Sequence, residues 1–128
     1  MTTEQEAAAL ATVAAFVRAW ERNDVDRIVD SFTDDALWYD GYPADPYRGR
    51  EEIRAQLDRY SRHISDVQIE VLHEAATGNV VLQERIDRGL RDGKPFEVAA
   101  ACVFHICDGR IAENRDYWNP GAYTKREA

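Results

Sequence analysis

The sequence is poor in cysteine and contains no long hydrophobic run. Among its 128 residues only Cys102 and Cys107 are cysteines, and they lie on one expected strand. Side chains of a strand alternate between its faces, so their odd offset points the two thiols in opposite directions. We therefore expect two reduced thiols, with no disulfide and no zinc site. No apolar run is long enough to span a bilayer, so we expect no membrane partner.

Net positive charge is also absent. The chain has 16 Lys and Arg residues against 24 Asp and Glu residues, which gives a formal charge of −8. Acids and bases are interspersed along the chain, which disfavours binding to nucleic acid or to anionic lipid, because both require a basic face. The N-terminal residues Met1 to Glu6 are acidic and lack the apolar core of a signal peptide. We therefore expect a cytoplasmic protein.

Three segments in the first half of the chain carry helical patterns. Thr3 and Glu6 form a capping box ahead of the first pattern. Asn23 and Asp24 precede a second, shorter pattern, and a third follows Gly49. The apolar positions of the three patterns are Leu10, Val13, Ala14, Val17 and Trp20, then Val25, Ile28, Val29 and Phe32, then Ile53, Leu57 and Tyr60.

The second half of the chain alternates with a period of two, which is typical of strands. We expect a long strand from Asp66 to a turn at 77–79, and a second strand over 80–90. The hairpin signals Asp92-Gly93 and Asp108-Gly109 separate two further strands, over 96–107 and 110–118. A short strand over 37–40 and a loop over 41–46 lie between the second and third helices.

This order of elements predicts an α+β fold in one domain over residues 1–128. Three N-terminal helices followed by an antiparallel meander have to pack as helices on one sheet. We expect this mostly antiparallel sheet to be strongly curved around the helices, as in a cystatin-like α+β barrel. A sheet curved in this way encloses a cone-shaped pocket.

Arg85 and Asp87 are the first candidates for chemistry. They lie two positions apart on the strand expected over 80–90, so their side chains share a face. Such a pair is either buried and held by partners, or solvated and worth little. Asp116 lies among aromatic residues on the last strand and is either a pocket carboxylate or a surface residue paired with Arg115. Spacing leaves both alternatives open.

The residues around these candidates resemble the limonene-epoxide hydrolase family. The similar segments, in the family's order and spacing, are 83–87, 92–94, 103–112 and 115–118. The helices and residues 32–36 resemble the wider superfamily of nuclear transport factor 2-like and SnoaL-like proteins. The resemblance implies a curved-sheet cone with a pocket, and a homodimer, but it does not imply one function.

The hydrolase resemblance implies a role for each candidate. In that family an Arg-x-Asp strand supplies a bridging arginine and an acid, and a later aspartate is the base; these positions match Arg85, Asp87 and Asp116. One-step addition of water to an epoxide needs a base on the water and an acid on the ring oxygen, and it needs no metal or cofactor. The family's water-holding tyrosine and asparagine match Tyr39 and Gly41. Gly41 has no side chain that could hold the water.

Asp40 allows a rival interpretation. With the residues that follow it to Arg54, it resembles the segment that carries the general base of ketosteroid isomerases. The oxyanion-hole positions of those enzymes match Phe16 and Cys102, which supply no such donors, so this chemistry is disfavoured. Asp40 is then either a second pocket acid or a loop cap. Candidates to replace the missing asparagine are Asp40, Tyr42 and Asn114.

The remaining pocket candidates are aromatic residues and one histidine. Trp20, Trp38 and Trp118 are typical core residues, but some aromatic side chains have to line any pocket of this fold. His105 is either a packing residue or a proton shuttle that faces the cavity.

Three functions fit these residues. The first is an epoxide hydrolase acting on a small hydrophobic or polyketide-like molecule, and the second is a SnoaL-like cyclase, isomerase or dehydratase. The third is a domain that binds a small ligand without catalysis. A shared pocket face for the three hydrolase residues, with Tyr39 near a bound water, favours the first. Convergence of Asp40 and His105 favours the second, and an apolar pocket with the charges outside favours the third.

Overall fold

The first two helices begin at capped residues, as the sequence predicts. In the computed structural model, which describes residues 1–118, α1 spans Glu4–Glu21 and follows a complete capping box between Thr3 and Glu6. Asp24 caps α2 (Val25–Asp30) by accepting from the backbone N–H of Arg27 over 3.1 Å. Helix α3 spans Gly49–Ser61. These caps satisfy backbone donors that have no partner within a helix.

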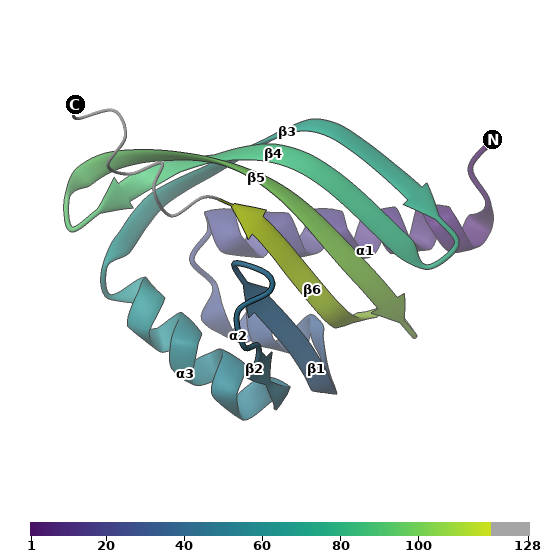
Figure 1. Cartoon of the computed structure of the whole chain (residues 1–128), viewed down its shortest axis with the longest axis horizontal. Coiled ribbons are helices and arrows are strands. Elements are labelled where there is room, and N and C mark those ends of the chain that lie inside the picture. The colour runs from purple at the N-terminus through teal and green to yellow at the C-terminus, as the bar shows by residue number, and fades with distance from the viewer. Residues whose placement is uncertain (119–128) are drawn as a thin grey trace.

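One open, mixed sheet forms the second layer. Its strands lie in the order β2-β1-β6-β5-β4-β3. Strands β3 to β6 form the predicted antiparallel meander, and β1 extends the sheet by pairing in parallel with β6. The helices cover one face of this curved sheet, and β3, β4 and β5 arch over α1 (Figure 1). The strand bounds are β1 Phe32–Asp40, β2 Tyr47–Arg48, β3 Ile64–Thr77, β4 Val80–Arg91, β5 Lys94–Cys107 and β6 Arg110–Trp118.

Two boundaries differ from the sequence-based expectation. Phe32, expected on the second helix, is the first residue of β1, so this strand begins earlier than predicted. The helical spacing from Val29 to Phe32 misled the prediction, because Phe32 enters the same core from a strand. Strand β2, which pairs with Leu37 and Trp38, was not predicted, since two residues are too few to show alternation.

The curvature of the sheet has local causes. The register of β3 against β4 shifts between Ser65 and Gln68 and again between Val71 and His73, and such bulges bend a strand. Gly89 lies on β4, where a Cβ would come within 2.9 Å of the Phe96 ring and of the Ser65 carbonyl oxygen. A glycine in a strand permits this close approach of neighbouring segments. The bend leaves space between the sheet and the helices.

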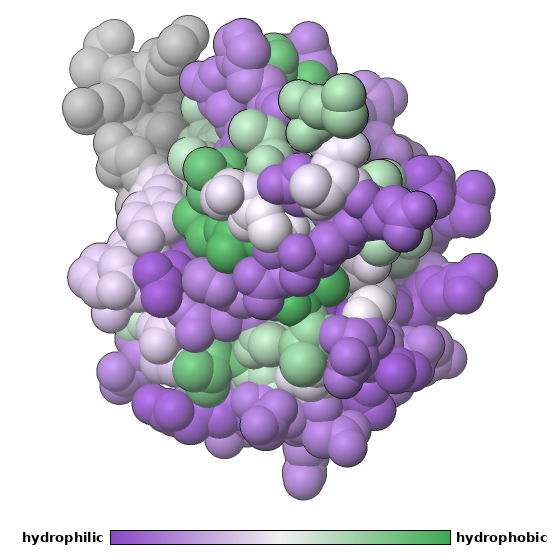
Figure 2. Space-filling model, turned by 90° about the vertical axis from the view of Figure 1, so that its right-hand side faces the viewer, coloured by the Kyte–Doolittle hydropathy of each residue, from purple (hydrophilic) through white to green (hydrophobic). Residues whose placement is uncertain are grey.

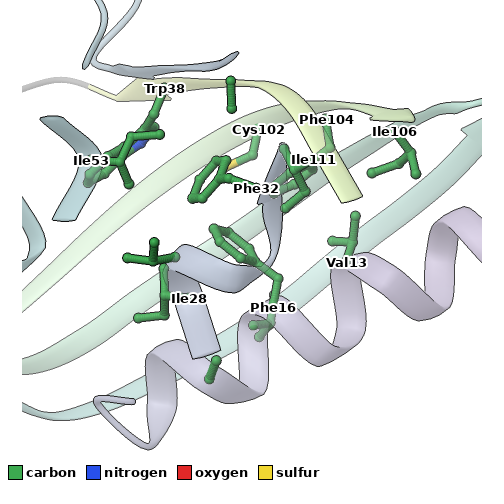
Figure 3. Packing of buried hydrophobic residues seen from close by; sticks show 14 of the residues in the cluster. Val13, Phe16, Ile28, Phe32, Trp38, Ile53, Cys102, Phe104, Ile106 and Ile111 are labelled. Atoms are coloured by element: carbon green, nitrogen blue, oxygen red, sulfur yellow. The ribbon is translucent and has the colours of Figure 1, made fainter. Parts of the chain in front are cut away.

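The hydrophobic core lies between α1 and the concave face of the sheet. Phe16 of α1 packs edge to face on Phe32, with ring centroids 5.4 Å apart, and on Phe104, 5.8 Å apart. Figure 3 shows Phe16 pointing toward the strands that carry these two rings. At the end of the molecule with the N-terminus, hydrophilic residues predominate and hydrophobic residues form scattered patches (Figure 2).

The two cysteines agree with the sequence analysis. Cys102 is buried and Cys107 is exposed, and both are free thiols, as their odd offset predicts. Among residues 1–118, no helix has the length and apolar character needed to cross a bilayer.

We predict that Phe16→Ala lowers the free energy of unfolding by about 3–5 kcal/mol, because it removes a ring that is 1% exposed and contacts three other rings. Arg18→Ala, on the exposed side of the same helix, is the matched control and should change the stability by less than about 0.5 kcal/mol. Denaturant unfolding of both variants tests this. Equal losses would contradict the assignment of the core.

Candidate active site

A cavity of about 110 Å³ opens between the helices and the concave face of the sheet. Apolar and aromatic side chains form most of its wall, and one arginine and three aspartates project into it. This combination of an apolar wall with a few polar groups is typical of small-molecule sites. The lining residues are Trp20, Trp38, Asp40, Tyr60, Ile64, Val67, Ile69, Arg85, Asp87, Phe96, Val98, Ala100, Asp116 and Trp118.

The Arg85–Asp87 pair is buried and held by partners. Alternation along β4 turns both side chains toward the cavity, as the sequence predicts. Arg85 Nη2 donates to Asp87 Oδ2 over 3.2 Å, and Nε lies 3.0 Å from Oδ1. The second contact is close enough for an ion pair but lacks hydrogen-bond alignment. On the other side, Arg85 Nη1 reaches Gln83 Oε1 at 3.5 Å, and Gln83 is itself bound to Glu74.

Asp116 is fixed by two groups that can only donate. Its Oδ2 accepts from Trp38 Nε1 over 2.9 Å, and its Oδ1 accepts from Asn114 Nδ2 over 3.0 Å. Asn114 is fully buried and shares its face of β6 with Asp116, two positions away. Hydrogen bonds from such donors favour a carboxylate over a carboxylic acid. Asp116 is therefore a pocket group, not a surface residue paired with Arg115.

Asp40 is a second carboxyl beside Asp116. The two residues lie directly opposite each other in the parallel pairing of β1 with β6, and both line the cavity. The Tyr60 hydroxyl of α3 donates to Asp40 Oδ2 over 2.8 Å. The alternatives left open for Asp40 are therefore decided in favour of a pocket acid.

Burial and charge separate the three carboxyl groups. Burial raises the pKa of Asp87, and the opposing charge of Arg85 does not fully offset this. Burial also raises the pKa of Asp40, with a further contribution from the charge of Asp116, against hydrogen bonds from Tyr60 and Trp118. Burial by itself would lower the pKa of Arg85. The acidic groups around Arg85 raise this pKa overall, so the guanidinium stays charged. One cation thus faces three acids.

Several predicted site residues lie outside the cavity. Tyr39 is on the opposite face of β1 from Trp38 and Asp40, and its ring packs on Tyr42, with centroids 5.0 Å apart. Because neighbouring residues of a strand point to opposite faces, Trp38 and Asp40 line the cavity in place of Tyr39. His105 alternates with the buried Phe104 and Ile106 and does not line the cavity.

Phe16 and Cys102 belong to the core behind the pocket. Phe16 packs among other aromatic rings, and Cys102, opposite Asp116 on β5, is 1% exposed. Burial raises the pKa of the Cys102 thiol, and the charge of Asp116 raises it further. Neither residue supplies the oxyanion donor that an isomerase of the ketosteroid type needs.

Gly41 has a backbone role. Its φ of +96° belongs to a turn in which the backbone N–H groups of Gly41 and Tyr42 both donate to the Asp116 carbonyl oxygen. A Cβ at this position would approach Trp118 Nε1 to 3.3 Å. The glycine therefore fixes the end of β1 beside Asp116, and its missing side chain removes nothing from the cavity.

The sequence analysis missed two polar residues of the site. Tyr60 was expected only as an apolar position of the third helix, although its hydroxyl needs a partner when buried. Gln83 shares a face with Arg85 by the same alternation that identified Asp87, and this signal was available. Among residues 1–118, no three His, Cys, Asp or Glu side chains form a group that could hold a metal ion.

Comparison with protein families decides the family of this chain. Residues 13–114 match the family described as the SnoaL-like domain. The chain belongs to the SnoaL-like domain family. This membership agrees with the resemblance to SnoaL-like and nuclear transport factor 2-like proteins inferred from the sequence.

Solved structures that resemble this SnoaL-like domain include enzymes. An LEH-like epoxide hydrolase of M. tuberculosis shares 26% identity and a TM-score of 0.79, over 89% of this chain and 84% of that one. SalBIII, an epoxide hydrolase/cyclase-like enzyme with a role in pyran ring formation in the polyether salinomycin, shares 24% identity and a TM-score of 0.84, over 94% and 97%. A ketosteroid isomerase-like protein of Catenulispora acidiphila, solved with trimethylamine, shares 22% identity and a TM-score of 0.77, over 95% and 90%.

We predict that Arg85→Met lowers the free energy of unfolding by about 3–5 kcal/mol at neutral pH, because it leaves buried carboxylates without a cation. The loss should shrink as the pH falls, since protonation of the cavity carboxylates removes the charge that Arg85 would otherwise balance. Arg88→Met is the matched control on the same strand. Arg88 pairs with Glu70 and Glu97 at the surface, so its loss should change the stability by about 0–1 kcal/mol. Unfolding measured at several pH values tests both, and equal effects would contradict the assigned role of Arg85.

Proposed function

We propose that this SnoaL-like domain is an epoxide hydrolase that adds water to an epoxide in one acid–base step. Arg85, Asp87 and Asp116 line one cavity, which is the arrangement that favours hydrolysis among the three functions considered. Charges inside the cavity argue against a purely apolar binding site. His105 lies away from it, which argues against a site built on Asp40 and His105.

In the proposed step Asp116 acts as the base and Asp87 as the acid. Asp116 takes a proton from water while the water oxygen attacks one carbon of the epoxide. The bond from that carbon to the ring oxygen breaks, and the ring oxygen takes the proton of Asp87. The product is a diol, and transfer of a proton from Asp116 to Asp87 through solvent restores the enzyme. Arg85 orients Asp87 and stabilises the negative charge that moves between the two carboxyls.

Two buried atoms carry this proposal. Arg85 Nε and Asp87 Oδ1 are buried and form an ion pair over 3.0 Å, but neither has an aligned hydrogen-bond partner among the described residues. Buried polar groups without partners are rare in folded proteins and call for an explanation. An epoxide oxygen at this place would accept a hydrogen bond from a protonated Asp87. The base, by contrast, is held by Trp38 and Asn114 before any substrate binds.

The cavity wall supports a small hydrophobic substrate. Trp20, Phe96 and Trp118 surround the charged residues together with aliphatic side chains. An apolar cavity of about 150 Å³ can bind benzene, so a cavity of about 110 Å³ accommodates an epoxide ring and a few attached carbons. A larger, polyketide-like substrate would place only its reacting end here.

A second candidate is cyclisation by the same machinery. If a hydroxyl group of the substrate replaced water as the nucleophile, Asp116 would deprotonate that hydroxyl and the product would be a cyclic ether. The overall similarity to SalBIII favours this candidate. The two reactions differ in the source of the attacking oxygen and need the same acid and base.

We predict that a panel of small cyclic and aryl epoxides yields diols that contain one oxygen atom from ¹⁸O-labelled water. Asp116→Asn and Asp87→Asn should each lower kcat/KM by about 10²- to 10⁴-fold, the usual contribution of a general base or acid. Asp108→Asn, the same change in the exposed β5–β6 turn, is the control and should keep full activity. Turnover that survives both pocket substitutions would contradict the assigned roles. A cyclic ether without labelled oxygen would favour the cyclase.

We further propose a homodimer that forms through the outer face of the sheet. The described helices cover only the concave face (Figure 1). On the outer face, cross-strand pairing aligns Leu82 with Val103, Arg115 and Tyr39. On that face Leu82 is 45% exposed and Tyr117 is 38% exposed. A second copy is the partner implied by the superfamily, and pairing of two such faces would cover these side chains.

We predict that sedimentation velocity gives the mass of a dimer for the parent and of a monomer for Leu82→Glu, because each dimer would bury two like charges in an apolar contact. Ala55→Glu, on an exposed position of α3, adds the same charge away from the outer face and should remain a dimer. A monomeric parent would contradict the proposal.

A further inference from the structure

Two carboxyl groups of the cavity are direct neighbours. Asp40 and Asp116 occupy paired positions of the parallel strands β1 and β6, and the turn after Asp40 is tied to the Asp116 backbone by two hydrogen bonds of 3.1 and 2.8 Å. The backbone thus holds the two side chains next to each other on the cavity side. Two ionised carboxylates in such a position repel each other strongly, because little water screens them.

The hydrogen bonds indicate which of the two keeps a proton. Asp116 accepts from Trp38 Nε1 and Asn114 Nδ2, one donor on each oxygen. Asp40 Oδ2 accepts from the Tyr60 hydroxyl over 2.8 Å. A tyrosine hydroxyl can both donate and accept, so it tolerates either form of Asp40. Asp40, with one partner that tolerates either form, is therefore the better place for a proton than Asp116, with two donors.

A protonated aspartate has nearly the shape and hydrogen-bonding capacity of an asparagine. It offers one O–H donor and one carbonyl oxygen, whereas the ionised form can only accept. A water between the two carboxyls would accept a hydrogen bond from Asp40 and donate one to Asp116. Its lone pair of electrons would then be free to attack an electrophile in the cavity.

We propose that Asp40 is a positioning residue which, as a neutral carboxylic acid, holds the water that Asp116 deprotonates. This inference rests on the proposed hydrolysis and extends it to a residue outside the acid, the base and the bridging arginine. It also explains why the chain needs no asparagine at position 41, since Asp40 supplies an equivalent group from the correct face of β1.

The surroundings of Asp40 agree with a retained proton. Burial raises the pKa of Asp40, and the charge of Asp116 raises it further. Arg85, whose charge would favour an ionised neighbour, makes its hydrogen bonds with Asp87 and Gln83 on β4. The titratable groups that surround Asp40 in the site are Asp116 on β6, Tyr60 on α3, Cys102 on β5, and Arg85 and Asp87 on β4.

The first test needs no substrate. A carboxyl whose pKa is raised in the folded protein binds its proton more tightly there than in the unfolded chain. The stability that it contributes is present at low pH and is lost as the pH rises from the ordinary carboxyl range through the raised pKa. Asp40→Asn removes this loss, so the stability of the variant relative to the parent should increase with pH across that window. Asp35→Asn, an exposed position on the same strand, is the control and should show a constant difference.

The second test compares two substitutions in kcat/KM over a range of pH. Asp40→Asn should stay within about threefold of the parent at low pH, and its decline at high pH should shift upward, because the asparagine cannot ionise. Asp40→Ala should lose about 10- to 100-fold at every pH, as expected for one missing hydrogen bond to the nucleophile.

The outcomes separate this inference from the proposed function. An Asp40→Asn variant as inactive as Asp40→Ala would make Asp40 the base and overturn the inference, as would a stability difference that does not change with pH. Full activity of Asp40→Ala with an unchanged pH profile would also overturn it. If the parent opens no epoxide while the stability difference grows with pH, the hydrolase proposal fails and the retained proton on Asp40 is supported.

Discussion

One guanidinium has to balance three carboxyl groups, and the rest of the site depends on this constraint. Arg85 is the only cationic residue among the described residues that line the cavity, whereas Asp40, Asp87 and Asp116 all do so. A half-buried cavity does not tolerate several uncompensated charges, so part of the set has to keep its protons. Burial raises the pKa of Asp40 and Asp87, while Asp116 accepts hydrogen bonds from two fixed donors, Trp38 Nε1 and Asn114 Nδ2. The proposed hydrolysis relies on this charge balance, because it needs one carboxyl as an acid and another as a base.

The topology of the sheet makes this balance possible. The parallel pairing of β1 with β6 joins two ends of the domain and sets Asp40 beside Asp116. The antiparallel meander then carries the concave face across β5 to Arg85 and Asp87 on β4. The fold alone does not choose the reaction. Hydration and cyclisation of an epoxide share the same acid and base, and they differ only in which oxygen atom reaches Asp116.

Local sequence predicted the elements and part of the site. The caps at Thr3 and Asp24 and the hairpin signals Asp92-Gly93 and Asp108-Gly109 act over a few residues, and the structure confirms them. Alternation along one strand also acts over a few residues, and it correctly placed Arg85 and Asp87 on a common face. The resemblance to a known family was needed to add Asp116 to this pair, because spacing along the chain says nothing about which strands become neighbours.

The sequence by itself therefore determined the helices, the meander and the shared face of Arg85 and Asp87, since each depends on contacts between residues close in the chain. Only the tertiary structure decided which face of β1 lines the cavity. The family resemblance matched the water-holding positions to Tyr39 and Gly41, whereas the parallel pairing with β6 turns Trp38 and Asp40 inward. The physical reason is the period of two: a shift of one residue exchanges the faces of a strand, and only the partner strand, distant in sequence, fixes that register.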